Sequence, residues 1–225
     1  MRVRWLGQSA FLLEGERRVL IDPFGDIRDR FAGRGIAFDY PPIEDVAADL
    51  VLVTHEHLDH NGVEVVVGDP IVIRSTAGRL DSPVGEVVAI ASEHDARAGT
   101  ERGPNTVFCF TLDGFRVCHF GDFGQAGLRP EQAAAIGEVD VLFVPVGGEV
   151  TLDGTAAATV VGQLRPRIAV PMHYRNVAVG FLEPPDGFFE AFGGTVAQLP
   201  RPDFVVDEHL GEGAVVVAPA PPLGE

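Results

Sequence analysis

The sequence contains no lysine: all 17 basic residues are arginines, set against 33 acidic residues for a net charge of −16 at pH 7. So acidic a chain, with its arginines dispersed, repels a phosphate backbone, and we expect no nucleic-acid partner. It also lacks any apolar run approaching the roughly 18–20 residues that a membrane span needs. The first ten residues carry no long apolar core and no clear cleavage site, so no signal peptide is predicted. We therefore expect a cytoplasmic location and no membrane partner.

Cysteine is scarce as well, since only Cys109 and Cys118 occur. The Asp-Gly pair at 113–114 lies midway between them and predicts a two-residue hairpin turn. Counting outward from that turn places the two cysteines opposite each other on neighbouring strands. In a reducing cytoplasm we expect two buried free thiols.

With 225 residues and 46% hydrophobic content, the chain is expected to form one domain over residues 1–218, followed by a disordered proline-rich tail at 219–225. Many strands followed by helices predict an α/β fold with two packed sheets and outer helices. Residues 26–48 are expected to form an exposed excursion that sets specificity, and residues 62–68 are ambiguous. The apolar patterns predict strands at 2–6, 10–14, 18–22, 50–54, 71–75, 86–91, 106–120 (a hairpin), 139–145, 167–171, 195–199 and 214–218, and helices at 130–136, 154–164 and 185–192.

The segment VLVTHEHLDHNG (51–62) joins an apolar strand to four coordinating side chains within six positions. Residues 50–54 form a continuous apolar run, typical of a strand buried on both faces. Directly after it come His55, His57, Asp59 and His60. So many such groups are hard to explain as core or as solvated surface. Imidazole together with carboxylate suits Zn, Fe or Mn better than Ca or Mg, so a metal site is predicted.

This H-x-H-x-D-H pattern resembles the signature of the metallo-β-lactamase superfamily. Further segments resemble that superfamily in order and spacing: RVRWLGQSAFLLEGERRVLIDPF (2–24) with its closing Asp22, GDFG (121–124), PVGG (145–148) and PMHY (171–174). The resemblance extends to the small ascorbate-6-phosphate lactonase-like subgroup, whose members often begin with Trp-x-Gly-His-Ser. Here Gln8 stands where that subgroup usually has histidine.

The resemblance implies an αββα sandwich of two mixed sheets with outer helices, and a two-metal site at one edge of the sheets. His55, His57 and a third histidine would hold the first metal, and a second group would hold the other. The implied ligands are His55, His57, Asp59, His60, His94, Asp122 and His173, with Asp59, His60 and His173 on the second metal and Asp122 bridging.

Two histidines compete for the third position on the first metal. His119 lies inside the predicted hairpin strand, where it faces Phe108 by the same count that pairs the cysteines. His94 instead opens a polar loop after the apolar run EVVAIAS, as His55 and His173 do after their strands. We therefore assign His94 as the ligand and expect His119 to orient a ligand by hydrogen bonding.

The implied cofactors are two divalent metals, most simply Zn, with Mn or Fe as alternatives. Such a pair lowers the pKa of a bridging water, and the resulting hydroxide would hydrolyse an ester, lactone, amide or phosphoester. Asp59 would accept or relay a proton. Four residues are expected to contact a small anionic or carbonyl substrate: Arg102, Asn105, Tyr174 and Arg175.

Two other interpretations stay open. An iron-dependent oxidoreductase of the same superfamily, similar to persulfide dioxygenases, would bind one iron and need no complete second site. A non-catalytic, metal-stabilised binding protein would use the same ligands. The full ligand set, with His60 and His173 completing a second site, favours the hydrolase.

Overall fold

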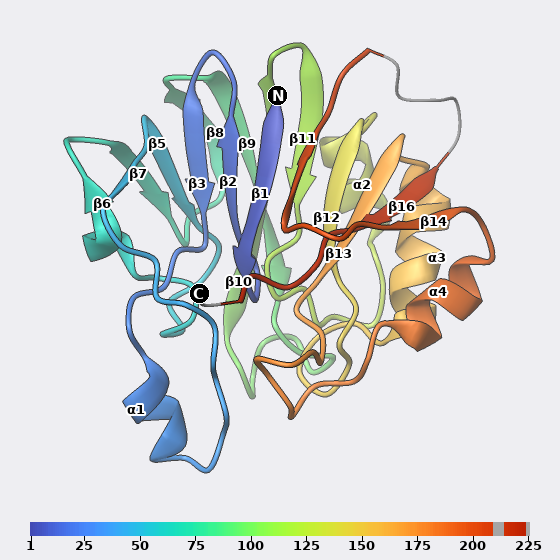
Figure 1. The fold of residues 1–225 in the computed structure, drawn as a ribbon. Coiled ribbons are helices and arrows are strands. Elements are labelled where there is room, and N and C mark those ends of the chain that lie inside the picture. Colours follow the sequence, from blue (N-terminus) through green and yellow to red (C-terminus); the bar gives the residue numbers. More distant parts are fainter. Residues whose placement is uncertain (209–213, 224–225) are drawn as a thin grey trace.

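Two mixed β-sheets face each other in the computed structural model, which describes residues 1–208 and 214–223 (Figure 1). The first sheet has six strands in the order β15-β1-β2-β3-β5-β7. Its members are β1 (Arg2–Gly7), β2 (Ala10–Glu14), β3 (Arg18–Ile21), β5 (Leu50–Val53), β7 (Ile71–Arg74) and β15 (Asp203–Val205). Strands β3, β5 and β7 run parallel and the others pair antiparallel.

The second sheet has eight strands in the order β14-β16-β13-β12-β11-β10-β9-β8. They are β8 (Gly78–Ser82), β9 (Gly85–Glu93), β10 (Pro104–Leu112), β11 (Phe115–His119), β12 (Val141–Pro145), β13 (Ile168–Met172), β14 (Val196–Gln198) and β16 (Val215–Ala218). The short strands β4 (Val46–Ala47) and β6 (Val66–Val67) pair separately, next to the 3-10 helix η1 (Val63–Val65). The ambiguous stretch 62–68 is thus a helical turn followed by a short strand.

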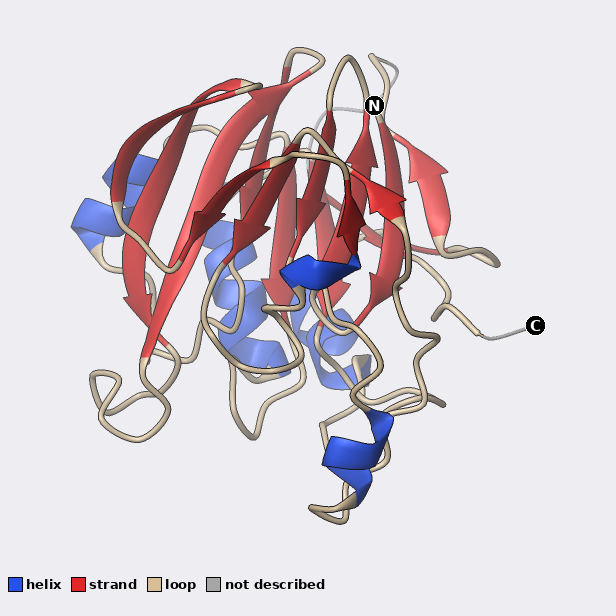
Figure 2. Cartoon of the chain, turned by 90° about the vertical axis from the view of Figure 1, so that its left-hand side faces the viewer, coloured by secondary structure: helices blue, strands red, loops and turns tan. Residues whose placement is uncertain are grey.

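The helices are α1 (Arg28–Ala32), α2 (Pro130–Ile136), α3 (Gly154–Leu164) and α4 (Asp186–Phe192). Helices α2, α3 and α4 lie beside the eight-stranded sheet, whereas α1 lies beyond the ends of the strands (Figures 1 and 2). The two mixed sheets with outer helices agree with the predicted fold. No helix in the described part of the chain is long and apolar enough to cross a membrane.

Local sequence signals explain why the first and last residues of two helices were predicted correctly. Helix α2 begins at Pro130, whose fixed φ and missing N–H suit a first helical turn. Helix α3 is capped by Asp153, whose Oδ1 accepts a hydrogen bond of 2.8 Å from the Ala156 N–H.

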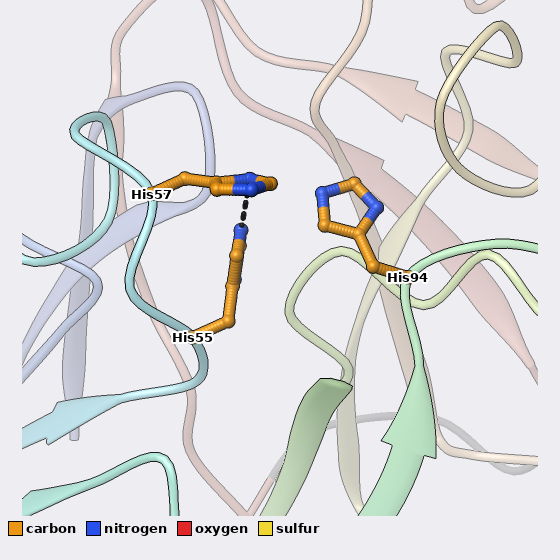
Figure 3. Close-up of side chains that lie close together, drawn as sticks. All are labelled: His55, His57 and His94. Carbon is orange, nitrogen blue, oxygen red and sulfur yellow. Dashed lines mark hydrogen bonds between the residues drawn. The ribbon is translucent and has the colours of Figure 1, made fainter. Parts of the chain in front are cut away.

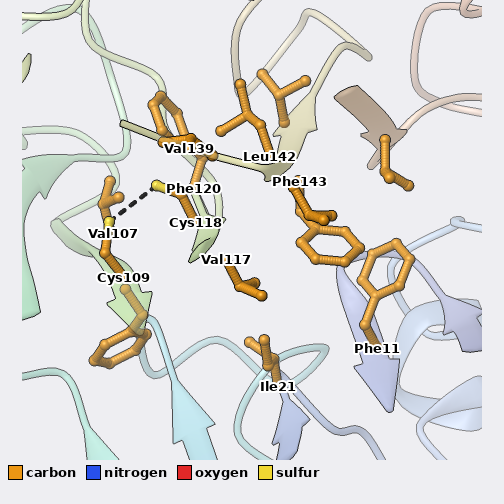
Figure 4. Packing of buried hydrophobic residues seen from close by; sticks show 14 of the residues in the cluster. Phe11, Ile21, Val107, Cys109, Val117, Cys118, Phe120, Val139, Leu142 and Phe143 are labelled. Atoms are coloured by element: carbon orange, nitrogen blue, oxygen red, sulfur yellow. Dashed lines mark hydrogen bonds between the residues drawn. The ribbon is translucent and has the colours of Figure 1, made fainter. Parts of the chain in front are cut away.

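The predicted hairpin is confirmed in register. Asp113 and Gly114 both have positive φ angles, 51° and 81°, as the two-residue turn requires. Strands β10 and β11 therefore pair Cys109 with Cys118, and the two buried free thiols lie with their Sγ atoms 3.1 Å apart (Figure 4).

The excursion at 26–48 is not wholly exposed, so that expectation was wrong in part. Phe31, Phe38 and Tyr40 are buried in a second hydrophobic cluster together with Phe24. The rings of Phe31 and Phe38 lie 4.8 Å apart, and those of Phe38 and Tyr40 lie 5.3 Å apart. Phe31 lies in the five-residue helix α1, and Phe38 and Tyr40 lie outside the helices and strands, so no hydrophobic period marks these aromatics.

Four elements of the described chain lie where no helix or strand was predicted: α1, β4, β8 and β15. Strand β8 reads GRLDS and has no buried residue, so no apolar alternation reveals it. At the C-terminal end, the Ala220 N–H donates a hydrogen bond of 3.0 Å to the Arg201 carbonyl. The disordered tail at 219–225 and the single domain over 1–218 stay predictions.

The topology brings several strand ends to one edge. Strands β9 and β11 both run antiparallel to β10, and β11, β12 and β13 are parallel to one another. The carboxyl ends of β9, β11, β12 and β13 therefore meet at the same edge of the sheet. His94 directly follows β9 and His173 directly follows β13, so the fold delivers both histidines to that edge.

Candidate metal centre

The Asp122 carboxylate is the centre of the predicted ligand set. Its Oδ2 lies 3.1 Å from Nε2 of His94 and 3.2 Å from Nε2 of His173. The same oxygen lies 3.3 Å from Nε2 of His60 and 3.8 Å from Nε2 of His55. One carboxylate oxygen thus faces four imidazoles, as expected of a residue that bridges two cations.

The remaining ligands fall into two groups, and Asp122 lies close to members of both. The nitrogens of His55, His57 and His94 lie within 4.8 Å of one another. Figure 3 shows these three rings converging, with His55 Nε2 and His57 Nδ1 3.0 Å apart. Asp59, His60 and His173 form a second group within the same limit. The structure therefore brings together all seven predicted ligands, in the expected division.

Asp22 fixes the rings of His55 and His60 through hydrogen bonds. Its Oδ1 accepts the Thr54 N–H at 2.8 Å, and its Oδ2 accepts the Thr54 hydroxyl at 2.7 Å. Asp22 Oδ2 also lies 2.9 Å from His60 Nδ1, and Thr54 Oγ1 lies 3.1 Å from His55 Nδ1. Both histidines consequently turn Nε2 toward the site. The sequence marked Asp22 only as the end of the first hairpin and gave no sign of this function.

The turn between β1 and β2 supports the two carboxylate ligands. Gln8 Nε2 donates a hydrogen bond of 3.0 Å to Asp59 Oδ2, and the Ser9 hydroxyl donates one of 3.3 Å to Asp122 Oδ1. His119 is buried in β11, and its Nε2 lies 3.0 Å from the Ser9 carbonyl oxygen. His119 Nδ1 also accepts the Gly121 N–H at 3.1 Å, next to Asp122. His119 therefore contacts the backbone beside the ligands, and the direct hydrogen bond to a ligand expected for it is not among its contacts.

The backbone is unusual at three of these positions. Gln8, Asp22 and His173 have φ angles of 51°, 47° and 52°, in the left-handed region that non-glycine residues rarely adopt. Such residues cluster at functional sites. Glycines from the two short motifs pack against the ligand loops: a Cβ on Gly124 would lie 2.5 Å from the His94 carbonyl oxygen, and one on Gly147 would overlap the His173 carbonyl oxygen. The close approach of this backbone to the ligand loops explains why glycine occupies these positions in the motifs GDFG and PVGG.

The electrostatics of the cluster fit a cation. Burial alone would lower the pKa of His60, but the carboxylates of Asp122, Asp59 and Asp22 together raise it well above its usual range. Burial and the neighbouring His60 lower the pKa of His55. Among the described residues, the buried His60 Nε2 has no hydrogen-bond partner. The surrounding carboxylates thus favour a positive charge at His60, and His60 Nε2 has no hydrogen-bond partner in the described part of the chain. A divalent cation bound at this nitrogen would supply that charge in place of a proton.

Comparisons with known proteins agree with this geometry. A family model described as a β-lactamase superfamily domain matches residues 2–173. A UPF0173 metal-dependent hydrolase of Thermococcus kodakarensis is 32% identical over 208 residues, which cover 78% of this chain and 85% of that one. The chain belongs to the metallo-β-lactamase superfamily, as a metal-dependent hydrolase.

Solved structures extend the comparison to nearly the whole chain. The crystal structure of a candidate Zn-dependent hydrolase of the metallo-β-lactamase superfamily from Thermotoga maritima is 30% identical, with a TM-score of 0.76 over 96% of this chain and 97% of that one. An isothiocyanate hydrolase from Delia radicum gut bacteria has a TM-score of 0.63 over 84% of this chain and 91% of its own, at 15% identity. At that identity the likeness shows a common fold alone.

A cavity of about 410 Å³ opens beside the metal centre of this hydrolase. Asp59, His57, His94, Asp122 and His173 line it. The rest of its wall comes from Phe31, Arg34, Ile36, Glu56, Leu58, Arg102, Val150 and Phe181. A substrate in this cavity would therefore lie against residues of both ligand groups.

Only Arg102 of the four predicted substrate contacts lines the cavity; Asn105 does not. Asn105 is 2% exposed, and its Nδ2 donates hydrogen bonds of 2.8 Å to Ser92 Oγ and to the Phe120 carbonyl oxygen. Its Oδ1 accepts the Asp122 N–H at 3.1 Å. Asn105 thus positions the Asp122 backbone, and the prediction of substrate contact was wrong.

Tyr174 and Arg175 also lie off the cavity. The buried Tyr174 ring packs against Trp5, with centroids 5.4 Å apart. Arg175 is exposed, and its backbone N–H donates to the Glu183 carbonyl oxygen at 2.8 Å. Sequence proximity to His173 suggested these two residues, but the backbone turns away after that ligand. Arg34 lines the cavity unpredicted, because nothing in its local sequence marks it.

Proposed function

We propose that this metal-dependent hydrolase binds two divalent metals, most simply Zn²⁺, and cleaves an ester, lactone, amide or phosphoester bond in a small molecule. The observation that carries the proposal is the position of Asp122 Oδ2, within 3.8 Å of one nitrogen on each of four histidines drawn from both ligand groups. A single metal would leave one of those groups without a cation.

The ligand chemistry favours Zn²⁺ over the alkaline-earth cations. Imidazole nitrogens predominate, and the carboxylates of Asp59 and Asp122 complete the set. When bound, the metals would lower the pKa of a water molecule and polarise the bond to be cleaved. The chain's own contribution is to hold the ligand atoms rigidly, through Asp22, Gln8 and Ser9, so that little reorganisation accompanies the reaction.

Asp59 is the residue to which we assign proton transfer. It lines the cavity, and its Oδ2 lies 3.6 Å from His60 Nε2. Burial raises the pKa of Asp59, but the charge of His60, its hydrogen bond to Asp59 and the charge of His173 together outweigh burial and lower that pKa below its usual range. Asp59 is therefore ionised at neutral pH and can accept a proton beside the substrate.

Elemental analysis of protein purified without added metal, followed by a hydrolase panel, tests the proposal. We expect about two metals per chain, loss of hydrolysis on chelation, and recovery when metal is restored. The panel contains lactones, carboxylic esters, phosphodiesters and phosphomonoesters. The resemblance to the ascorbate-6-phosphate lactonase-like subgroup makes a lactone its first member.

Each other outcome contradicts a stated part of the proposal. Hydrolysis that survives complete demetallation would overturn the metal mechanism. One iron per chain, with oxygen consumed in the presence of a persulfide, would identify an oxidoreductase. Two tightly bound metals without turnover on any class of substrate would favour a metal-stabilised binding protein.

A further inference from the structure

Most arginines of this acidic chain form ion pairs, but the two that line the cavity form none with the described residues. Eleven of the 17 arginines lie within 4.0 Å of an acidic group. Arg34 and Arg102 both line the cavity, and neither has an ion-pair partner within the part of the chain that the structure describes. Glu56 also lines the cavity, but Arg74 neutralises it, with Nε 3.0 Å from Oε1. Two arginines without an ion-pair partner among the described residues therefore line the cavity beside the metal centre.

The backbone under Arg34 is anchored to the second hydrophobic cluster. Arg34 follows helix α1, and its N–H donates a hydrogen bond of 2.9 Å to the Phe31 carbonyl oxygen. The Phe31 side chain is 6% exposed and packs in that cluster. Arg34 thus extends from a fixed segment and not from an unsupported loop tip.

The backbone under Arg102 is anchored by a carboxylate. Asp95 Oδ2 accepts the N–H of Arg102 at 2.8 Å and that of Glu101 at 3.1 Å. Asp95 Oδ1 accepts the N–H of Arg97 at 2.8 Å and that of Gly99 at 3.0 Å. One side chain therefore holds the whole loop that carries Arg102, directly after His94. The two arginines come from segments about 70 positions apart in sequence, at 34 and 102, and meet at one cavity.

The remaining wall is largely apolar. Phe31, Ile36, Leu58, Val150 and Phe181 line the same cavity as the arginines and the metal ligands. Phe181 is 38% exposed, which places an aromatic surface within reach of a ligand. Apolar walls with a few placed charges are typical of sites for small molecules that combine an apolar body with a charged group.

We propose that the substrate carries an oxyanion, a carboxylate or a phosphate, joined through an apolar body to the bond that is cleaved, and that Arg34 and Arg102 bind this oxyanion. The inference rests on the proposed function, because it takes the cavity beside the metal ligands as the substrate site. Guanidinium groups match carboxylate and phosphate oxygens with paired N–H donors. In a chain of net charge −16, such local positive groups favour the binding of an anion.

A matched pair of chromogenic esters tests the proposal. Mono-4-nitrophenyl glutarate and 4-nitrophenyl pentanoate have acyl chains of equal length and differ in a terminal carboxylate. For Arg34→Ala and Arg102→Ala we expect the KM of the glutarate ester to rise about tenfold, at least five times more than that of the pentanoate ester. Arg175→Ala removes an exposed arginine that lies off the cavity, and it should change neither KM. Equal effects on both esters, or an equal effect of Arg175→Ala, would overturn the proposal.

Calorimetry separates failure of this inference from failure of the proposed function. The metal-containing protein is titrated with butyl phosphate, pentanoate and uncharged 1-pentanol. We expect an anion to bind at least tenfold more tightly than pentanol, and to lose that preference in the Arg34→Ala Arg102→Ala double variant; the tighter anion identifies phosphate or carboxylate. Arginine-dependent anion binding without hydrolysis of these esters or of any substrate of the hydrolase panel would support anion binding by the two arginines and contradict the proposed reaction. Hydrolysis of either ester without any arginine-dependent anion preference would support the reaction and refute the inference.

Discussion

Replacing Gln8 by leucine should weaken one metal site selectively. Gln8 is fully buried, and its Nε2 donates a hydrogen bond of 3.0 Å to the Asp59 carboxylate. Leucine keeps most of the volume but removes that donor. A hydrogen bond to a charged group contributes about 1.5–3 kcal/mol, which corresponds to roughly 10- to 150-fold in affinity. We therefore expect the metal held by Asp59, His60 and His173 to bind roughly 10- to 150-fold more weakly.

The backbone at Gln8 should survive the change. Its carbonyl oxygen accepts the Trp5 Nε1–H at 3.0 Å and the His173 N–H at 3.3 Å, and neither bond involves the side chain. Metal content after dialysis against graded chelator, measured together with the melting temperature, separates weaker binding from misfolding. Gln8→His restores the residue usual in the lactonase-like subgroup and serves as the matched variant, expected to retain more metal than Gln8→Leu. Equal loss of both metals, or no loss of either, would refute the assignment of Gln8 to Asp59.

Three further predictions follow from the same geometry. His94→Ala should lower bound metal and nearly abolish activity, whereas His119→Ala should keep most of its metal and lose at most about 10- to 100-fold in activity; metal content that collapses only in the His119 variant would exchange their assignments. Asp122→Asn keeps the shape but removes the bridging charge, so the second metal should weaken first and the rate should fall by orders of magnitude; unchanged metal content and turnover would mean that another residue bridges. In reduced protein, Cys109 and Cys118 should react with a thiol reagent only after unfolding, because both are fully buried; rapid reaction of either thiol in the native protein would contradict that burial.

The ligands of the metal centre could be predicted because four of them form a local motif and the resemblance to the superfamily implied the others. His55, His57, Asp59 and His60 are close in sequence, and His94 follows a strand as His55 and His173 do. The contacts made by the surrounding residues are set by tertiary structure, so no periodic pattern in the sequence predicts them. Asn105 illustrates the limit: its place in a polar stretch suggested a substrate contact, yet β10 directs its side chain toward Ser92 and Phe120.

The same distinction applies to the fold. Helices α2 and α3 have a proline or a capping residue at their first turn, so their bounds follow from the sequence. The hairpin follows from its Asp-Gly turn. Strands β8 and β15 show no apolar alternation, and partners distant in sequence hold them in place. Strand β15, for example, pairs with β1 across about 200 positions, between Arg2 and Val205.

Metal ligation and substrate selection are encoded in different parts of this chain. The ligands extend from strand ends and from the segment after β5, and buried hydrogen bonds to Asp22, Gln8 and Ser9 hold several of them. The cavity wall comes mainly from irregular segments, including the stretch 26–48 that contributes Phe31 and Arg34. Among the wall residues, Val150 holds a ligand, since its carbonyl oxygen lies 3.0 Å from His94 Nδ1, but that bond uses the backbone and not the side chain. Side-chain substitutions in the wall can therefore alter which molecule binds while the metals stay in place. That independence explains why the ligand set reveals the class of chemistry, while the substrate has to be inferred from charge and apolarity in the wall.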